Sequence, residues 1–122
     1  MKRMIAVSLI VFVLSAGCKK SSSNSSITVE YQVTTTNSSN IDISYNNVLG
    51  NKTQVNTQTS WVFDIIGPTK PYSAYIQASS SSPFSSIQTT CTVTILVNGG
   101  IVKTATASSN TIAVAEADYT VQ

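Results

Sequence analysis

Hydrophobic and polar residues alternate along most of this chain from Ile27 onward, with a period of two rather than the 3.6 of a helix. The run from Ile27 to Thr34 places aliphatic and aromatic residues at every second position and Thr, Glu and Gln between them. Side chains alternate in this way in a strand that has one buried face and one solvated face. The pattern predicts an all-β domain that covers residues 27–122.

Similar runs recur along the domain, separated by clusters of Asn, Ser, Gly and Pro. The expected strands cover residues 27–34, 41–45, 52–58, 61–65, 72–78, 88–97, 101–107 and 111–121. The polar run 52–58 is expected at a sheet edge, residues 79–86 are expected to form a loop, and Asn98-Gly99-Gly100 is expected to close a hairpin. Seven or eight short strands favour an immunoglobulin-like antiparallel two-sheet sandwich, with a small β-barrel as the alternative.

The first 17 residues follow a different pattern. Lys2 and Arg3 precede the apolar stretch Met4–Leu14, which small residues connect to Cys18. These 11 apolar residues, at about 1.5 Å each, are too few to cross a hydrocarbon core of about 30 Å as a helix. Basic, apolar and small-residue segments in this order are typical of a secretion signal. We expect cleavage between Gly17 and Cys18, with residues 18–26 as a Ser-rich tether.

The segment Leu14-Ser15-Ala16-Gly17-Cys18 resembles the lipobox of bacterial lipoproteins. The resemblance implies a diacylglyceryl group on the thiol of Cys18 and an acyl chain on its freed amino group. Two or more chains anchor a protein stably to a membrane, whereas one chain does so only marginally. The expected location is therefore the cell envelope, outside the cytoplasm, and Lys19 in place of an aspartate favours the outer membrane. An ordinary secretory signal with a coincidental cysteine is the alternative.

Charge and composition exclude several classes of function. From Cys18 onward the charges of five lysines are balanced by those of five carboxylates, so there is no basic stripe that could bind nucleic acid. The chain has no histidine, which removes the usual general base and the commonest metal ligand. Glycosidase-like catalysis needs two facing carboxylates, but Glu30, Asp42 and Asp64 fall at outward strand positions, where solvated charges are the preferred interpretation. We expect a domain that is not an enzyme and carries no cofactor besides the lipid.

Two acidic residues and one thiol are candidates for further chemistry. Glu116 and Asp118 lie two apart on the last strand, so they could share a cation. Two ligands do not make a metal site, and an acidic pair that protects a sheet edge is the preferred interpretation. Cys91 falls at an inward position of its strand, which predicts a buried and inert thiol.

Aromatic residues are the remaining candidates for binding. Tyr75 and Phe84 are expected to be exposed and to contact a ligand or a partner protein. Trp61 is expected to be the core tryptophan of the sandwich. A platform of Trp61, Tyr72 and Tyr75 for a sugar or an apolar ligand is the alternative.

Several short motifs also resemble the mycobacterial membrane protein small (MmpS) family. Residues 31–34 and 43–45 are similar to its first two strand motifs, Trp61 to its tryptophan, and the segment from Cys91 to Lys103 to its cysteine strand and hairpin. The resemblance implies a small periplasmic sandwich that serves an RND-type exporter of lipids or siderophores. This chain departs from the family in two ways. It has an expected lipid anchor, and it lacks the family's second cysteine near the C-terminus, where Tyr119 lies nearby.

The sequence thus predicts a lipid-anchored, non-enzymatic accessory or binding domain of the cell envelope. Its expected partners are the membrane, reached through the lipid, and an envelope protein or an apolar or glycan ligand. An accessory to an RND-type exporter is one form of this function. A structural or glycan-binding surface lipoprotein is the alternative.

Overall fold

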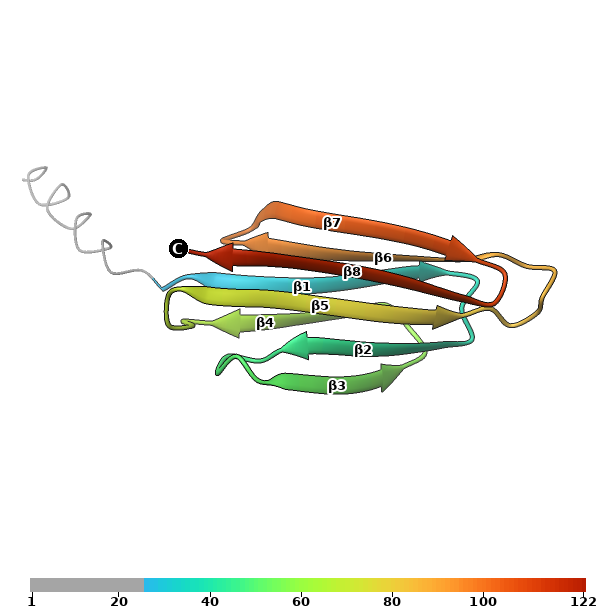
Figure 1. Cartoon of the computed structure of the whole chain (residues 1–122), viewed down its shortest axis with the longest axis horizontal. Coiled ribbons are helices and arrows are strands. Elements are labelled where there is room, and N and C mark those ends of the chain that lie inside the picture. Colours follow the sequence, from blue (N-terminus) through green and yellow to red (C-terminus); the bar gives the residue numbers. More distant parts are fainter. Residues whose placement is uncertain (1–25) are drawn as a thin grey trace, which may run out of the picture.

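A computed structural model describes residues 26–122; the expected signal and the lipidation site at Gly17 and Cys18 lie outside these residues. The described strands are β1 (Thr28–Thr36), β2 (Asn40–Asn46), β3 (Lys52–Thr57), β4 (Trp61–Ile66), β5 (Tyr72–Ser81), β6 (Thr89–Val97), β7 (Gly100–Ser109) and β8 (Ile112–Val121). They form two antiparallel sheets of four, ordered β4-β1-β6-β7 and β3-β2-β5-β8 (Figure 1). The two-sheet sandwich is confirmed, and the sheets do not close into a barrel.

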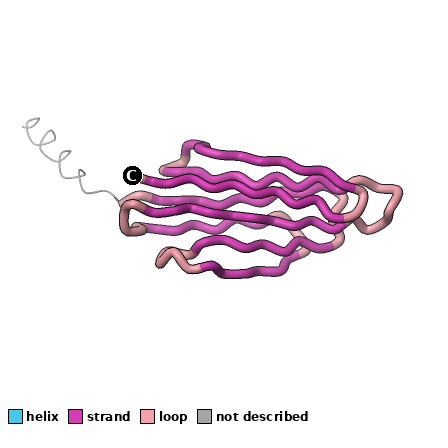
Figure 2. The backbone as a smooth tube through the Cα atoms, in the orientation of Figure 1, coloured by secondary structure: helices cyan, strands magenta, loops and turns pink. Residues whose placement is uncertain are grey.

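The connections between strands gather at the two ends of the sandwich (Figure 2). Only β2–β3 and β6–β7 are hairpins within one sheet, and the other five connections cross between the sheets. Within residues 26–122, no helix is long and apolar enough to cross a bilayer. The fold therefore has two faces of strands and two ends built from turns.

The core follows the alternation seen in the sequence. Every second residue along most of β1, β2, β5 and β6 is buried, as are Val29, Tyr31 and Val33 on β1. Burying one such aliphatic or aromatic side chain contributes about 1.5–3 kcal/mol. Because the inward residues of β8 are mainly alanines, this strand lies close against β6 and β7 of the other sheet. On the opposite side, aromatic rings fill the space between the sheets.

Two expectations about strands are confirmed. The polar strand β3 lies at the edge of its sheet. Asn98 and Gly99 form the two-residue turn between β6 and β7, with φ of 51° and 84°. Two positive φ values define the type I′ turn, whose twist matches the strands that it joins.

The expected loop over residues 79–86 is wrong at its start, because β5 continues to Ser81. Ser80 points inward and is fully buried, and its hydroxyl lies 2.6 Å from that of Thr89. A buried hydroxyl is tolerated when it is hydrogen-bonded. The run of serines therefore extends the strand instead of ending it.

Candidate functional site

The two ends of the sandwich, the entry end and the far end, differ in the connections that they hold. The entry end is where the chain enters at Ser26, and it holds the β2–β3 and β4–β5 turns and the β6–β7 hairpin. There the backbone N–H of Gly67 donates to the carbonyl of Ile27 at 2.8 Å. The far end holds the β1–β2, β3–β4, β5–β6 and β7–β8 connections (Figure 1).

A buried pair of tyrosines joins the two sheets at the entry end. The hydroxyl oxygens of Tyr31 on β1 and Tyr72 on β5 lie 3.1 Å apart. The Tyr72 hydroxyl also reaches the carbonyls of Asn46 and Asn47, at 2.8 and 2.9 Å, and the Tyr75 N–H donates to the Tyr31 hydroxyl. Burial raises the pKa of both phenols, because the charged form would lose its hydration.

A second buried hydroxyl pair joins the sheets at the far end. Ser80 on β5 contacts Thr89 on β6, and the Thr89 hydroxyl also lies 3.0 Å from the carbonyl of Thr36 on β1. Both side chains are fully buried. Strand β5 therefore carries one member of each pair, one near each end of its length.

Phe84 lies in the β5–β6 loop at the far end, and 65% of its surface is exposed. Hydrogen bonds fix the loop beneath it. The Ser82 hydroxyl lies within hydrogen-bond distance of the carbonyls of Phe84 (2.7 Å) and Ile87. The Ile87 N–H donates to the Phe84 carbonyl at 3.0 Å, and the Asn110 side chain donates to the Ser85 carbonyl at 3.0 Å. An exposed aromatic side chain is thus presented on an ordered loop.

Tyr75 points outward on the β3-β2-β5-β8 sheet, but it is half-buried there and therefore less exposed than expected. Its hydroxyl donates to Glu116 on β8 at 2.7 Å, and the Lys52 ammonium lies 4.1 Å from the centre of its ring. Burial and the neighbouring carboxylate raise the pKa of Tyr75 to about 12. Tyr75 therefore belongs to a hydrogen-bonded group of side chains on this face, instead of standing free.

Glu116 and Asp118 both lie exposed on β8, which is an edge strand. Their position on one face is as expected, but Glu116 is engaged by Tyr75. Within residues 26–122 no group of three or more His, Cys, Asp or Glu side chains is placed to hold a metal ion.

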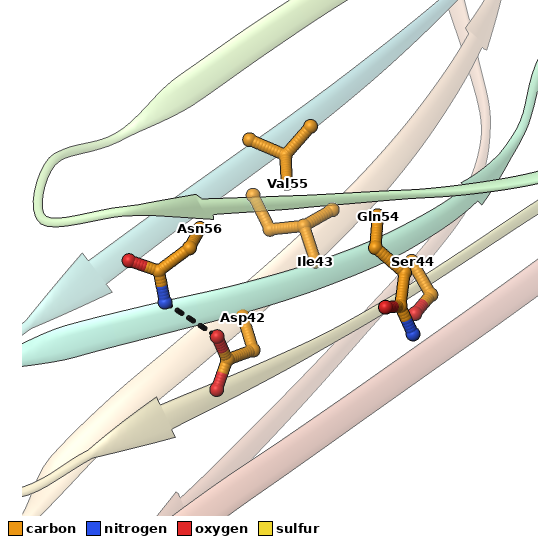
Figure 3. A pocket seen from close by; sticks show the side chains of 6 residues that line it. All are labelled: Asp42, Ile43, Ser44, Gln54, Val55 and Asn56. Atoms are coloured by element: carbon orange, nitrogen blue, oxygen red, sulfur yellow. Dashed lines mark hydrogen bonds between the residues drawn. The ribbon is translucent and has the colours of Figure 1, made fainter.

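The same outer face holds a hollow of about 420 Å³ beside β2 and β3 (Figure 3). Asp42 and Asn56 lie side by side there, with the Asn56 amide donating to the carboxylate at 2.5 Å. Ser44 and Gln54 are cross-strand neighbours, and the same row continues to Gln77 and Glu116. The face therefore offers a continuous set of amide, hydroxyl and carboxylate groups.

The alternative aromatic platform does not form. Tyr72 points into the core and Tyr75 points outward, because residues three apart in a strand lie on opposite faces. Trp61 lies on β4 of the other sheet, half-buried and packed against the core. Its ring stacks on that of Phe63 at 5.7 Å and lies 5.1 Å from that of Tyr45, between centroids.

Cys91 is fully buried on β6, as expected. Its sulfur lies 3.7 Å from the carbonyl of Ala78. Burial raises the pKa of the thiol, which disfavours the reactive thiolate.

A scan against protein-family models and a search of curated proteins both found no match to this chain.

Two features of the ends escaped sequence reasoning. The exposed pair Val48 and Leu49 lies in the β2–β3 turn, at the end where the chain enters. The signal was present in two adjacent apolar residues between Asn47 and Gly50, since turns are usually polar. The contact between Tyr31 and Tyr72 carried no such signal, because it depends on which strands face each other.

Proposed function

We propose that this protein is a lipid-anchored, non-enzymatic binding domain of the cell envelope, and that it contacts its partner through the far end. The observation that carries the proposal is Phe84, exposed on an ordered loop at the end opposite to the point of chain entry. The attachment itself is proposed from the lipobox at Cys18.

The geometry fits a domain that reaches away from a surface. Strand β5 has 10 residues, which at about 3.3 Å each separate the two ends by roughly 30 Å. A lipid at Cys18 would hold the entry end near the bilayer and present Phe84 away from it. A pre-ordered loop also binds at a lower entropic cost than a loop that must become ordered.

The side chains at the far end suit a weakly charged partner. Its four connections, residues 37–39, 58–60, 82–88 and 110–111, contain no Asp, Glu, Lys or Arg. Contact there would depend on an aromatic side chain and on hydroxyl and amide groups, as in many protein interfaces. Among envelope proteins, an RND-type exporter is the partner that the MmpS resemblance implies.

Several features support a role other than catalysis. The thiol of Cys91 is buried, and the carboxylates of Asp42 and Glu116 are each hydrogen-bonded to a neighbouring side chain. The thiol is thus out of reach of a substrate, and both carboxylates are already engaged.

A photo-crosslinking residue at position 84 tests the contact in intact envelopes. The matched control is the same crosslinking residue at position 106, which is exposed on strand β7 of the β4-β1-β6-β7 sheet. We expect a discrete adduct from position 84 and none from position 106. Adducts of equal yield from both positions, or none from position 84, would contradict the proposal.

Glycan binding on the outer face of β3-β2-β5-β8 is a second candidate, favoured by the row Gln54, Ser44, Gln77 and Glu116 beside the Tyr75 ring. Amides and carboxylates can hydrogen-bond sugar hydroxyls, and an aromatic face can stack on a sugar ring. Calorimetric titration with cell-wall oligosaccharides would test it. Gln77→Ala should weaken binding at least severalfold and Thr92→Ala, on the opposite face, should not; equal effects would refute this role.

A further inference from the structure

We infer that the entry end is itself a membrane-contact surface, which rests on the anchored role proposed above. The contact surface consists of Val48 and Leu49 from the β2–β3 turn, Phe63 and Ile66 from β4, and Lys70 from the β4–β5 turn. Its apolar members would enter the interfacial layer of the bilayer, and lysine would pair with anionic headgroups.

The apolar side chains of this surface are exposed to an unusual degree. Leu49 is 80% exposed, Ile66 is 69% exposed and Val48 is 43% exposed. Phe63, whose ring packs on those of Trp61 and Tyr45, keeps 38% of its surface exposed. Single exposed apolar residues are ordinary, whereas a contiguous group marks a contact site. The group is contiguous, because one hollow of about 310 Å³ is lined by Val48, Phe63 and Ile66. A second hollow, of about 490 Å³, is lined by Val48, Leu49 and Lys70.

Hydrogen bonds within the β2–β3 turn hold it in a conformation that exposes the side chains of Val48 and Leu49. The side-chain oxygen of Asn47 accepts from the N–H groups of Leu49 and Asn51, at 2.9 and 3.1 Å. The N–H of Gly50 donates to the Asn47 carbonyl at 2.8 Å, and Gly50 has a φ of 85°. Asn side chains stabilise turns in this way. Leu49 is therefore exposed on an ordered turn.

The entry point of the chain argues for a membrane as the occupant. The Gly67 N–H binds the Ile27 carbonyl, so Ile66 lies beside the place where residues 18–26 join the domain. Residues 18–26 number nine, and a fully extended chain of nine residues spans no more than about 30 Å. A lipid on Cys18 would thus keep this surface within that distance of the bilayer, where even a weak contact is effectively intramolecular.

Lys70 is the cationic side chain of this surface, and it favours the same occupant. Its β4–β5 turn contains no acidic residue. The ammonium of Lys52 lies over the Tyr75 ring instead. Asp64 lines the hollow with Phe63 and Ile66, and its cross-strand neighbour is Glu30. A lysine near an anionic bilayer strengthens the contact. The far end, with no charged residue in its connections, lacks this complement.

A fluorescence experiment on the lipidated protein tests the inference. An environment-sensitive thiol label is placed at Leu49→Cys or, as the matched control, at Phe84→Cys; Cys91 is buried and should not react. Each protein is mixed with vesicles of phosphatidylcholine and phosphatidylglycerol that contain a nitroxide-labelled lipid. We expect severalfold stronger quenching, with a blue shift, at position 49 than at position 84.

The outcomes separate the two proposals. Protein that floats with vesicles while both labels stay equally unquenched would overturn the membrane-contact surface and leave the lipid anchor standing. Protein that fails to float would overturn both. A label at position 49 that responds in native envelopes but not on vesicles would assign the surface to a protein partner and overturn the inference.

A charge variant provides a second measurement. Lys70→Gln should lower the ratio of inserted to free label at position 49 roughly fivefold on anionic vesicles, and should change little on phosphatidylcholine alone. Lys103→Gln, on the opposite edge strand β7, is the matched control and should have a smaller effect. Equal effects of the two variants, or no difference between the two lipids, would contradict the role of Lys70.

Discussion

The two ends of the sandwich share an internal construction and differ in what they present outside. Each end has a buried hydroxyl pair between the sheets, Tyr31 with Tyr72 at the entry end and Ser80 with Thr89 at the far end. Each also has an ordered turn that exposes apolar side chains. The entry end combines several aliphatic residues with Lys70, whereas the far end presents Phe84 and the exposed Ile112 among uncharged polar residues.

The two ends therefore suit different surroundings, although one scaffold builds both. A group of aliphatic side chains beside a lysine complements an anionic bilayer. A lone aromatic side chain on an uncharged surface complements a partner that is recognised by shape and hydrogen bonds. The internal pairs fix the relative position of the sheets at both ends, so each surface is held on a rigid support.

Removing the anchor should have the largest effect on this comparison. We expect Cys18→Ala to release nearly all of the protein from the envelope fraction, or to mislocalise it, while the domain stays folded. Any residual contact would then come from the entry end alone, which is weak without the lipid. Detergent phase separation and circular dichroism measure the two properties, and an unchanged detergent-phase fraction would contradict the proposal.

The hydroxyl pairs should differ in their contribution to stability. Tyr72→Phe leaves the Tyr31 hydroxyl and the carbonyls of Asn46 and Asn47 with fewer partners, so we expect a loss of about 2 kcal/mol. Thr89→Val affects the smaller pair and should cost about 1 kcal/mol. Urea denaturation of both variants checks the order, and a larger loss for Thr89→Val would reverse the comparison.

High pH should weaken the entry end and leave the far end unaffected. The folded-state pKa values of Tyr31 and Tyr72 are raised, so the stability that they contribute is complete below pH 10 and is lost as the pH rises above it. Each buried phenol should lower the free energy of unfolding by about 1.4 kcal/mol per pH unit. Tyr72→Phe should reduce this slope, and Thr89→Val should not; equal slopes in all three proteins would refute the assignment.

Substitutions on the outer surfaces of the two ends should have the smallest effect on stability. Leu49→Ser and Phe84→Ser each remove an exposed side chain from a turn that other residues hold in place. We expect changes within about 0.5 kcal/mol in thermal unfolding. A loss above 2 kcal/mol at either position would show that the side chain supports the fold instead of a contact.

Strands and faces were predictable because alternation records burial residue by residue. The polar sequence of β3 predicted its edge position, and the turn residues Asn98 and Gly99 predicted the hairpin. The order of strands in each sheet was not predictable, since the pattern does not specify which strands pair. The inward position of Ser80 and the contact between Tyr31 and Tyr72 depend on that order, and so does the grouping of Val48 with Ile66 at the entry end.

Mass spectrometry of the mature protein, extracted from membranes, determines directly whether the lipid is attached. We expect a chain that begins at Cys18 and carries a diacylglyceryl group on sulfur with an acyl chain on the amino group. A free thiol at that N-terminus, or a chain that still begins at Met1, would contradict this expectation.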